Sequence, residues 1–227
     1  MNNSIPNSVF QFLKELKENN NREWMQDHKN KYLANEKVLK KFYSEVEYGL
    51  NQTDKIAKVK IFRINRDLRF TPDKTPYNVH RSASFSREGA HRRGGYYLRL
   101  EPRNSYMAGG FFNPDPIDLR RIRKEFRMDS SEIRDVLSKR EFQKAFGSFS
   151  TENAVKTAPK GFSTDDENID LIRLKSFVVR HRFTDEEVFS EGFKDLLVEH
   201  YRLLRPFFDY MSSVLTTDLN GVSLLED

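Results

Sequence analysis

Residues 61–77 bring together side chains that could recognise an anion. The segment reads IFRINRDLRFTPDKTPY, with three arginines spaced three residues apart and a lysine five residues after the last of them. The planar guanidinium group of arginine donates paired hydrogen bonds that fit phosphate and carboxylate oxygens. The candidate ligand-binding residues are therefore Arg63, Arg66, Arg69, Lys74 and Tyr77, together with Trp24 from the N-terminal part of the chain.

Crowded cations need compensation, because two like charges about 5 Å apart repel by roughly 1–3 kcal/mol. A regular strand over residues 61–70 would put Arg66 on the apolar face, where an unpaired guanidinium is costly. Arg66 should then pair with a carboxylate or open onto a cleft. Asp67 and Asp73 are the nearby carboxylates. Either is a candidate acid or base if the protein is an enzyme, and that role would require a shifted pKa.

The positive charge of the chain is concentrated around this segment. The whole chain has a net charge of +5, but residues 55–103 contain 13 Lys and Arg against 4 Asp and Glu, a balance of 13 − 4 = +9. The remaining residues have 26 basic and 30 acidic side chains, a balance of −4. A concentrated basic region favours an anionic partner more strongly than the overall charge does.

Three functions are compatible with a basic middle segment. The first is a site, enzymatic or not, for a small molecule that carries a phosphate or carboxylate. The second is a nucleic-acid-binding module that uses the basic segment 55–103 as an open surface. The third is a structural or interaction protein whose arginines are all paired internally. In the second case, aromatic residues would stack on bases; the candidates are Tyr77, Phe85, Tyr96, Tyr97 and Tyr106.

Several classes of site are not indicated by the sequence. The chain has no cysteine, which excludes disulfides, thiolate metal sites and a cysteine nucleophile. Its five histidines are scattered without the spacing of a zinc site, and no nucleophile elbow, Walker loop or dinucleotide-binding fingerprint occurs. We therefore expect no metal and no cofactor. The absence of a signal-peptide pattern and of an apolar run of about 18 residues predicts a cytoplasmic protein without a membrane span.

The elements that must position these residues follow from the hydrophobic period. Apolar residues at helical spacing predict helices over residues 9–16 and 22–50, and again from residue 114 onward. Alternating residues predict strands over 58–64, 78–88, 95–101 and 105–112, with 177–179 closing the sheet. Capping boxes are expected at Thr164 and Thr184, and a kink at Pro206 in a last helix over 192–215. This order predicts a single α+β domain over residues 1–227, in which N-terminal and C-terminal helices flank a mostly antiparallel sheet.

The chain also resembles a bacterial protein family, domain of unknown function 2461 (DUF2461), along nearly its whole length. The resemblance rests on several uncommon strings in the same order, namely 19–24 (NNNREW), 62–77, 94–98 (GGYYL), 109–111 (GGF), 158–162 (APKGF), 174–177 (LKSF) and 204–206 (LRP). It implies a cytoplasmic protein of the same fold and assigns no catalytic residue. One departure is Asn78, where similar proteins often have lysine.

Overall fold

The chain divides into two compact units. The computed structural model describes residues 4–218 and 221–225. The first unit consists of Met1–Phe85, Tyr97–Met107 and Arg182–Glu199. The second consists of Ser86–Tyr96, Ala108–His181 and His200–Asp227. The single domain expected for residues 1–227 stays a prediction.

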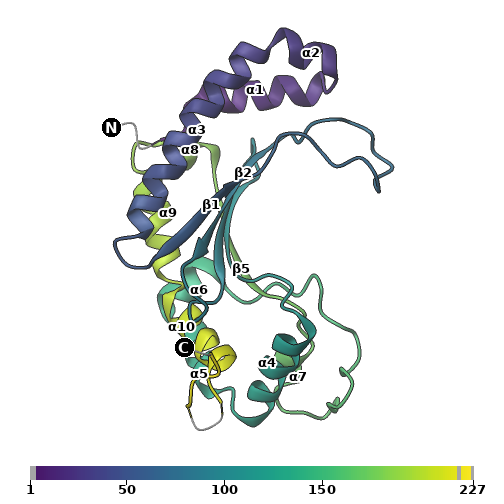
Figure 1. Cartoon of the computed structure of the whole chain (residues 1–227), viewed down its shortest axis with the longest axis vertical. Helices are drawn as coiled ribbons and strands as arrows, with labels where there is room; N and C mark the ends of the chain where they lie inside the picture. Colours follow the sequence, from purple (N-terminus) through teal and green to yellow (C-terminus); the bar gives the residue numbers. More distant parts are fainter. Residues whose placement is uncertain (1–3, 219–220, 226–227) are drawn as a thin grey trace. The chain divides into compact units, whose positions relative to one another are not determined.

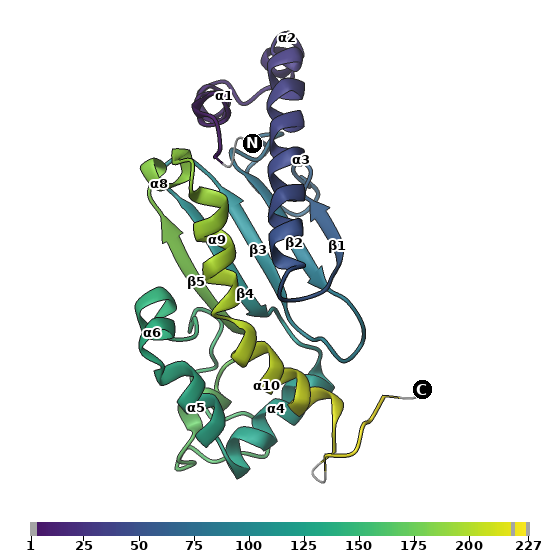
Figure 2. The same ribbon diagram turned by 90° about the vertical axis from the view of Figure 1, so that its left-hand side faces the viewer.

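A five-stranded antiparallel sheet supplies strand residues to both units, and its strands follow one another in chain order, as the labels in Figure 2 show. Figure 1 shows the same strands nearly edge-on. Helices precede and follow this sheet along the chain, which confirms the predicted α+β class. The strands are β1 (Ile56–Ile61), β2 (Arg81–Arg87), β3 (Gly95–Leu100), β4 (Ser105–Phe111) and β5 (Phe177–Phe183). Each lies within or beside a segment that the alternating pattern predicted.

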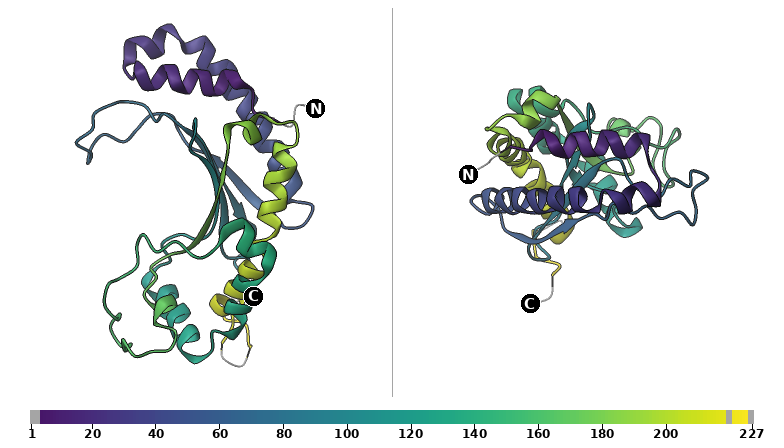
Figure 3. Two further views of the ribbon diagram at one scale, coloured as in Figure 1. Left: turned by 180° about the vertical axis from the view of Figure 1, so that it is seen from behind. Right: turned by 90° about the horizontal axis from the view of Figure 1, so that it is seen from above.

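The first unit begins with a helical hairpin. Helix α1 (Asn7–Glu18) packs against α3 (Lys29–Leu50), and Figure 3 shows the two running alongside each other when seen from above. The short α2 (Arg22–Asp27) joins them, and the side chain of Asn21 caps it by accepting a hydrogen bond of 2.9 Å from the backbone N–H of Trp24. The apolar side chains that α1 and α3 bury include Phe10, Leu13, Leu16, Leu39, Phe42 and Val46.

The single helix predicted for residues 22–50 is wrong at one position, because the helix is interrupted at His28. His28 ends α2 and precedes α3, and its Nδ1 atom lies 2.8 Å from the carbonyl oxygen of Trp24. The two rings are stacked, with their centroids 4.0 Å apart. The backbone N–H of His28 also donates to the Trp24 carbonyl at 3.0 Å, and the His28 carbonyl accepts from Tyr32 N–H at 3.0 Å. The helical hydrogen bonds therefore continue through His28, although its φ and ψ angles, −102° and 15°, leave the helical region.

Two helices of the first unit lie over the same side of the strands. These are α3 and α9 (Phe193–Arg202), as Figure 2 shows. Phe42 and Phe193 stack between them with centroids 5.6 Å apart. Helix α8 (Asp185–Phe189) comes just before α9, and the capping box predicted at Thr184 is present there. This contact holds α3 and α9 together on one side of the strands.

The second unit contains five complete helices and most of β4 and β5, as judged over the described residues. They are α4 (Pro116–Met128), α5 (Ser131–Ser138), α6 (Arg140–Phe146), α7 (Ile169–Ile172) and α10 (Arg205–Thr216). The capping box predicted at Thr164 is absent, since α7 starts only at Ile169. The predicted kink at Pro206 is a full interruption between α9 and α10. Pro206 occupies the first turn of α10, where the missing N–H leaves no helical hydrogen bond unmade.

The strand predicted over residues 61–70 is wrong. Strand β1 ends at Ile61, and the chain then folds back on itself until β2 begins at Arg81. Only one isolated antiparallel bridge, between Asn65 and Tyr77, continues the strand pattern in this segment. Residues on both arms of the segment bond to each other, so the alternation of apolar residues here does not mark a strand of the main sheet.

Candidate functional site

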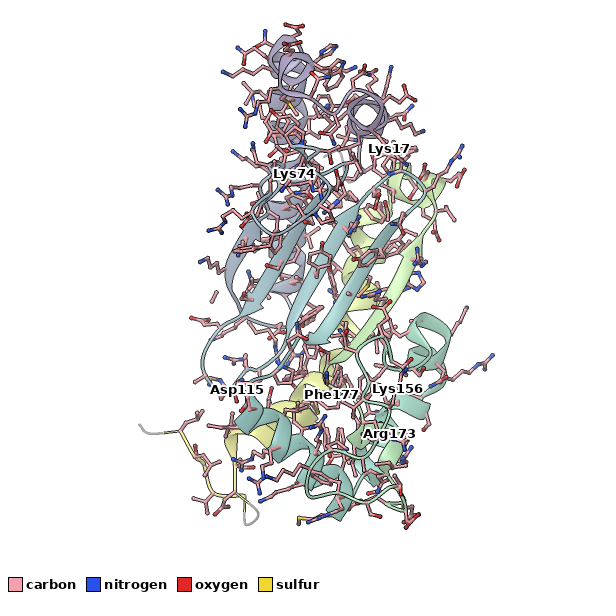
Figure 4. The ribbon with its side chains drawn as sticks, turned by 90° about the vertical axis from the view of Figure 1, so that its right-hand side faces the viewer. Lys17, Lys74, Asp115, Lys156, Arg173 and Phe177 are labelled. Carbon is pink, nitrogen blue, oxygen red and sulfur yellow. The ribbon has the colours of Figure 1, made fainter. Side chains whose placement is uncertain are left out.

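The segment from residue 62 to residue 80, called the arginine loop below, carries most of the predicted ligand-binding residues. The backbone N–H of Arg66 donates to the carbonyl of Pro76 at 2.9 Å, and that of Asn78 donates to the carbonyl of Ile64 at 2.7 Å. These bonds form a narrow neck. Figure 4 shows Lys74 beyond this neck, on the side of the strands opposite α3 and α9. The loop is therefore a distinct projection of the first unit.

A second support for the neck comes from the turn between α1 and α2. The side-chain amide of Asn20 donates to the carbonyl oxygen of Tyr77 at 2.9 Å, and its oxygen accepts from the backbone N–H of Tyr77 at 3.1 Å. This paired geometry is that of two neighbouring strands. One side chain thus fixes the loop to the helical hairpin.

Arg66 belongs to the interior of the loop. Its Nη1 atom donates to Asp73 Oδ2 at 2.5 Å, to the carbonyl of Thr75 at 3.2 Å and also to the Thr75 hydroxyl group. The Nζ atom of Lys74 donates to the carbonyl oxygen of Leu68 at 2.9 Å. Arg66 and Lys74, two of the four cations predicted to bind an anion, therefore stabilise the shape of the loop. For Arg66, the sequence required either a carboxylate partner or a cleft, and the structure shows the carboxylate partner, Asp73.

Arg69 and Arg63 are less constrained. Arg69 forms an ion pair with Asp67 at 2.7 Å, in which the two side chains are 76% and 53% exposed. Solvent screens such an exposed pair, so it contributes little to stability. Arg63 is exposed, and its guanidinium has no hydrogen-bond or ion-pair partner among residues 4–218 and 221–225. Of the three arginines, Arg63 is the most available to a ligand.

The three arginines surround one open hollow of about 540 Å³. Its lining residues are Arg63, Arg66, Asp67, Leu68 and Arg69. Tyr77 and Trp24 do not line it. Tyr77 belongs to the neck, and Trp24 packs in the helical hairpin, where its ring lies 5.6 Å from that of Phe12. The role of these two residues in ligand binding stays a prediction.

Both candidate acid–base residues are held in the ionised form. Hydrogen bonds from Arg69 lower the pKa of Asp67. The backbone N–H of Thr75 and the side chain of Arg66 lower the pKa of Asp73 to about 2. A general base or acid works best when its pKa is near the operating pH. The carboxylates of the loop are therefore suited to holding arginines in position and poorly suited to proton transfer at neutral pH.

Three aromatic side chains of the first unit, one at the base of the loop and two on β3 and β4, form a second feature. The rings of Phe62 and Tyr97 lie 6.0 Å apart, and those of Tyr97 and Tyr106 lie 5.9 Å apart. All three are half-buried. Phe85 and Tyr96, also suggested for base stacking, are completely covered. That suggestion is wrong for these two residues, because they face the core.

One exposed residue of the loop was not selected from the sequence. Phe70 is 91% exposed, whereas a regular strand over residues 61–70 would place it on the same apolar face as Arg66. Thr71 and Pro72, which follow it, are typical turn residues and were a usable signal. The guanidinium carbon of Arg69 lies 5.6 Å from the centre of the Phe70 ring.

The family model described as conserved hypothetical protein (DUF2461) matches residues 8–210. The chain belongs to the DUF2461 family. The matched residues include the entire arginine loop, the turn that contains Asn20 and all five strands. Among curated proteins and solved structures, none matches this DUF2461 chain.

Other features of this DUF2461 protein offer less chemistry. A hollow of about 460 Å³ in the second unit is lined by Arg134 and Asp170 together with neutral polar and apolar side chains. Arg134 already bonds to Ser130, Asn168 and Asp170. The described ranges contain no group of three or more side chains able to hold a metal ion. In the same ranges, no helix has both the length and the apolar character needed to cross a membrane.

Proposed function

We propose that this protein binds a small molecule carrying a phosphate or carboxylate group, and that the arginine loop is the binding site. The observation that carries the proposal is the exposed, unpartnered guanidinium of Arg63 beside Arg69 at one open hollow, as judged over the described residues. We further propose a bacterial, cytoplasmic setting, in keeping with a chain that has no cysteine.

The cations of the loop have separate roles in this proposal. Arg63 offers both arms of its fork to an anion, and Arg69 can exchange its exposed pair with Asp67 for a bond to the ligand. Arg66 and Lys74 keep the loop in shape and add positive potential. A loop that already has its bound shape loses little conformational entropy on binding, which increases affinity.

Thermal unfolding with added phosphate, sulfate, succinate and nucleotides tests the proposal. A ligand at a hundredfold excess over its Kd stabilises the folded state by about 2.7 kcal/mol. We expect this shift in the wild type, and a clear reduction in Arg63→Met and Arg69→Met. The control Lys37→Met removes an exposed cation from α3 and should keep the full shift. An unchanged melting temperature of the wild type with every anion would contradict the proposal.

The same measurements distinguish the alternative functions. Internal pairing of every arginine predicts no response to any anion. Within the loop, the ion pairs of Arg66 with Asp73 and of Arg69 with Asp67 support this alternative. A nucleic-acid-binding surface over residues 55–103 predicts a response to oligonucleotides that falls steeply with salt and is only partly reduced by one substitution. A catalytic role for Asp67 or Asp73 receives no support from their lowered pKa values.

A further inference from the structure

Phe70 is the feature of the arginine loop that anion binding leaves unexplained. Among the large hydrophobic side chains of the described chain it is the most exposed, at 91%, ahead of Ile117 at 82%. Isolated exposed apolar residues are common on protein surfaces. Phe70 differs from such residues because its ring is next to a cation that lines the candidate site.

The arrangement links the ring to the hollow through Arg69. The guanidinium carbon of Arg69 lies 5.6 Å from the Phe70 ring centre, and Arg69 also lines the hollow. The backbone just before Phe70 is held, since Arg69 N–H donates to Asp67 Oδ1 at 3.2 Å and the Lys74 side chain donates to the carbonyl of Leu68 at 2.9 Å. A constrained loop thus presents an open aromatic surface directly beside anion-binding groups.

We propose that the ligand of the arginine loop is a nucleotide, with its base stacked on Phe70 and its phosphate held by Arg63 and Arg69. This inference rests on the proposed function, because it names the class of anion bound at the same site. A simple phosphate or carboxylate would not use the exposed ring. A nucleotide carries a flat aromatic group and a phosphate in one molecule, which are the two groups that this end of the loop can bind.

The expected gain in affinity from stacking is large enough to measure. Stacking of one base on an aromatic side chain increases affinity by about 5- to 150-fold, judged by alanine substitution. The positive charge of Arg69 beside the same ring favours electron-rich surfaces and adds to this effect. The nucleotide can be free or part of a single-stranded nucleic acid, since both present a base linked to a phosphate.

Calorimetric titration with a matched pair of ligands isolates the contribution of the base. AMP and ribose 5-phosphate differ only in the adenine, so we expect wild-type protein to bind AMP about 5- to 150-fold more tightly. Phe70→Ala should remove this difference while leaving the affinity for ribose 5-phosphate unchanged. Ile117→Ala, which truncates a comparably exposed residue of the second unit, should retain the difference. Because Phe70 is almost fully exposed, its substitution should not affect folding.

The outcomes separate this inference from the proposed function. Equal affinities for AMP and ribose 5-phosphate in the wild type, or an unchanged ratio in Phe70→Ala, would overturn the nucleotide assignment and leave anion binding in place. If succinate binds but neither AMP nor ribose 5-phosphate does, the nucleotide assignment is likewise overturned and anion binding remains. If no anion binds at all, both proposals fail.

A direct spectroscopic test uses Phe70→Trp. This variant keeps an aromatic surface at the same position, and stacking of adenine should quench the fluorescence of the added tryptophan, with no quenching by ribose 5-phosphate. Comparison of AMP with a ten-residue oligoadenylate then identifies the source of the nucleotide. Tighter binding of the oligomer with a steep salt dependence indicates a nucleic acid strand, and equal binding indicates a free nucleotide. Fluorescence that responds to neither AMP nor the oligomer would overturn the inference.

Discussion

Asn20 and Tyr77 lie 57 residues apart in sequence and exchange two hydrogen bonds. The side-chain NH₂ of Asn20 donates to the Tyr77 carbonyl at 2.9 Å, and the side-chain oxygen of Asn20 accepts from the Tyr77 N–H at 3.1 Å. Tyr77 also forms the bridge with Asn65 across the neck of the arginine loop. The position of the loop is therefore coupled to the turn between α1 and α2.

Replacement of Asn20 by alanine should loosen the neck. It leaves the N–H and carbonyl groups of Tyr77 without their partner, and we expect a loss of about 1–3 kcal/mol in unfolding free energy. Hydrogen exchange should show faster exchange of the Tyr77 amide. The control Asn19→Ala removes a side-chain bond to Glu15 within the same turn and should leave that amide unaffected. Unchanged protection of Tyr77 in Asn20→Ala would refute the coupling.

A buried ion pair of the first unit gives a second prediction. Arg81 bonds to both oxygens of Glu36 at 2.6 and 2.8 Å, and its side chain is 4% exposed. Removing one partner of a buried pair costs about 3–5 kcal/mol, and Glu36→Ala should lose that amount in urea unfolding. By contrast, Asp67→Ala removes the exposed ion pair with Arg69 and the bond from the Arg69 backbone N–H, both at the solvent-exposed surface, and should destabilise the protein much less. Similar losses in both variants would argue against this distinction.

The strands show how much of the fold the alternation of apolar residues could predict. The hairpin of β3 and β4 was predicted correctly because Tyr96, Leu98 and Leu100 alternate with polar or half-exposed residues, and burial of one face follows directly from that period. The same period over residues 61–70 gave a wrong strand, because contacts across the neck outweigh local alternation. Periodicity describes one face of an element and contains no information about which distant segment pairs with it.

The sequence predicted where the candidate site lies but not what each of its side chains does. The three closely spaced arginines were enough to identify the arginine loop, because crowded guanidinium groups need carboxylates or a bound anion near them in any fold. The division of labour between Arg66 and Arg63 was not predictable, because it depends on the turn that brings Asp73 and Thr75 back to Arg66. The exposure of Phe70 depends on the same turn. Side-chain roles in a folded-back loop are set by contacts that sequence spacing does not specify.

Gly110 allows β4 to approach β5 closely in the second unit. Its φ angle is +145°, and an added Cβ atom would lie 2.0 Å from the backbone carbonyl oxygen of Phe177. We expect Gly110→Ala to lose more than about 2 kcal/mol, because the backbone of β5 would have to move. Gly147→Ala is the matched control. It has a positive φ of +66° but no atom within 4 Å of the added Cβ, so thermal unfolding should show a smaller loss.

His80 predicts a dependence of stability on pH. Burial and the charge of Arg99 lower its pKa to about 4, although Glu101 acts in the opposite direction. Unfolded His80 takes up a proton near pH 6.5, whereas folded His80 does so only near pH 4. Falling pH therefore favours the unfolded state between these values. With allowance for solvent screening, we expect a loss of about 1–2 kcal/mol from this residue.

The variant His80→Gln isolates this contribution. Its unfolding free energy, measured at pH 7.5 and pH 4.5, should fall less than that of the wild type over the same interval. The other carboxylates and histidines are common to both proteins, so the difference between the two falls reports His80 alone. Identical falls in variant and wild type would show that His80 titrates normally in the folded protein.

The closed neck makes the arginine loop a transferable module. Its two arms meet through the Arg66–Pro76 and Asn78–Ile64 backbone bonds, and its tip is held by Asp67, Asp73 and Lys74 from within the same segment. A graft of residues 63–78 into the turn of an unrelated β-hairpin would keep these internal bonds and would lose the two bonds that Asn20 makes with Tyr77. Because such a graft carries Arg63, Arg69 and Phe70 on one segment, it would test the proposed anion binding apart from the rest of the protein.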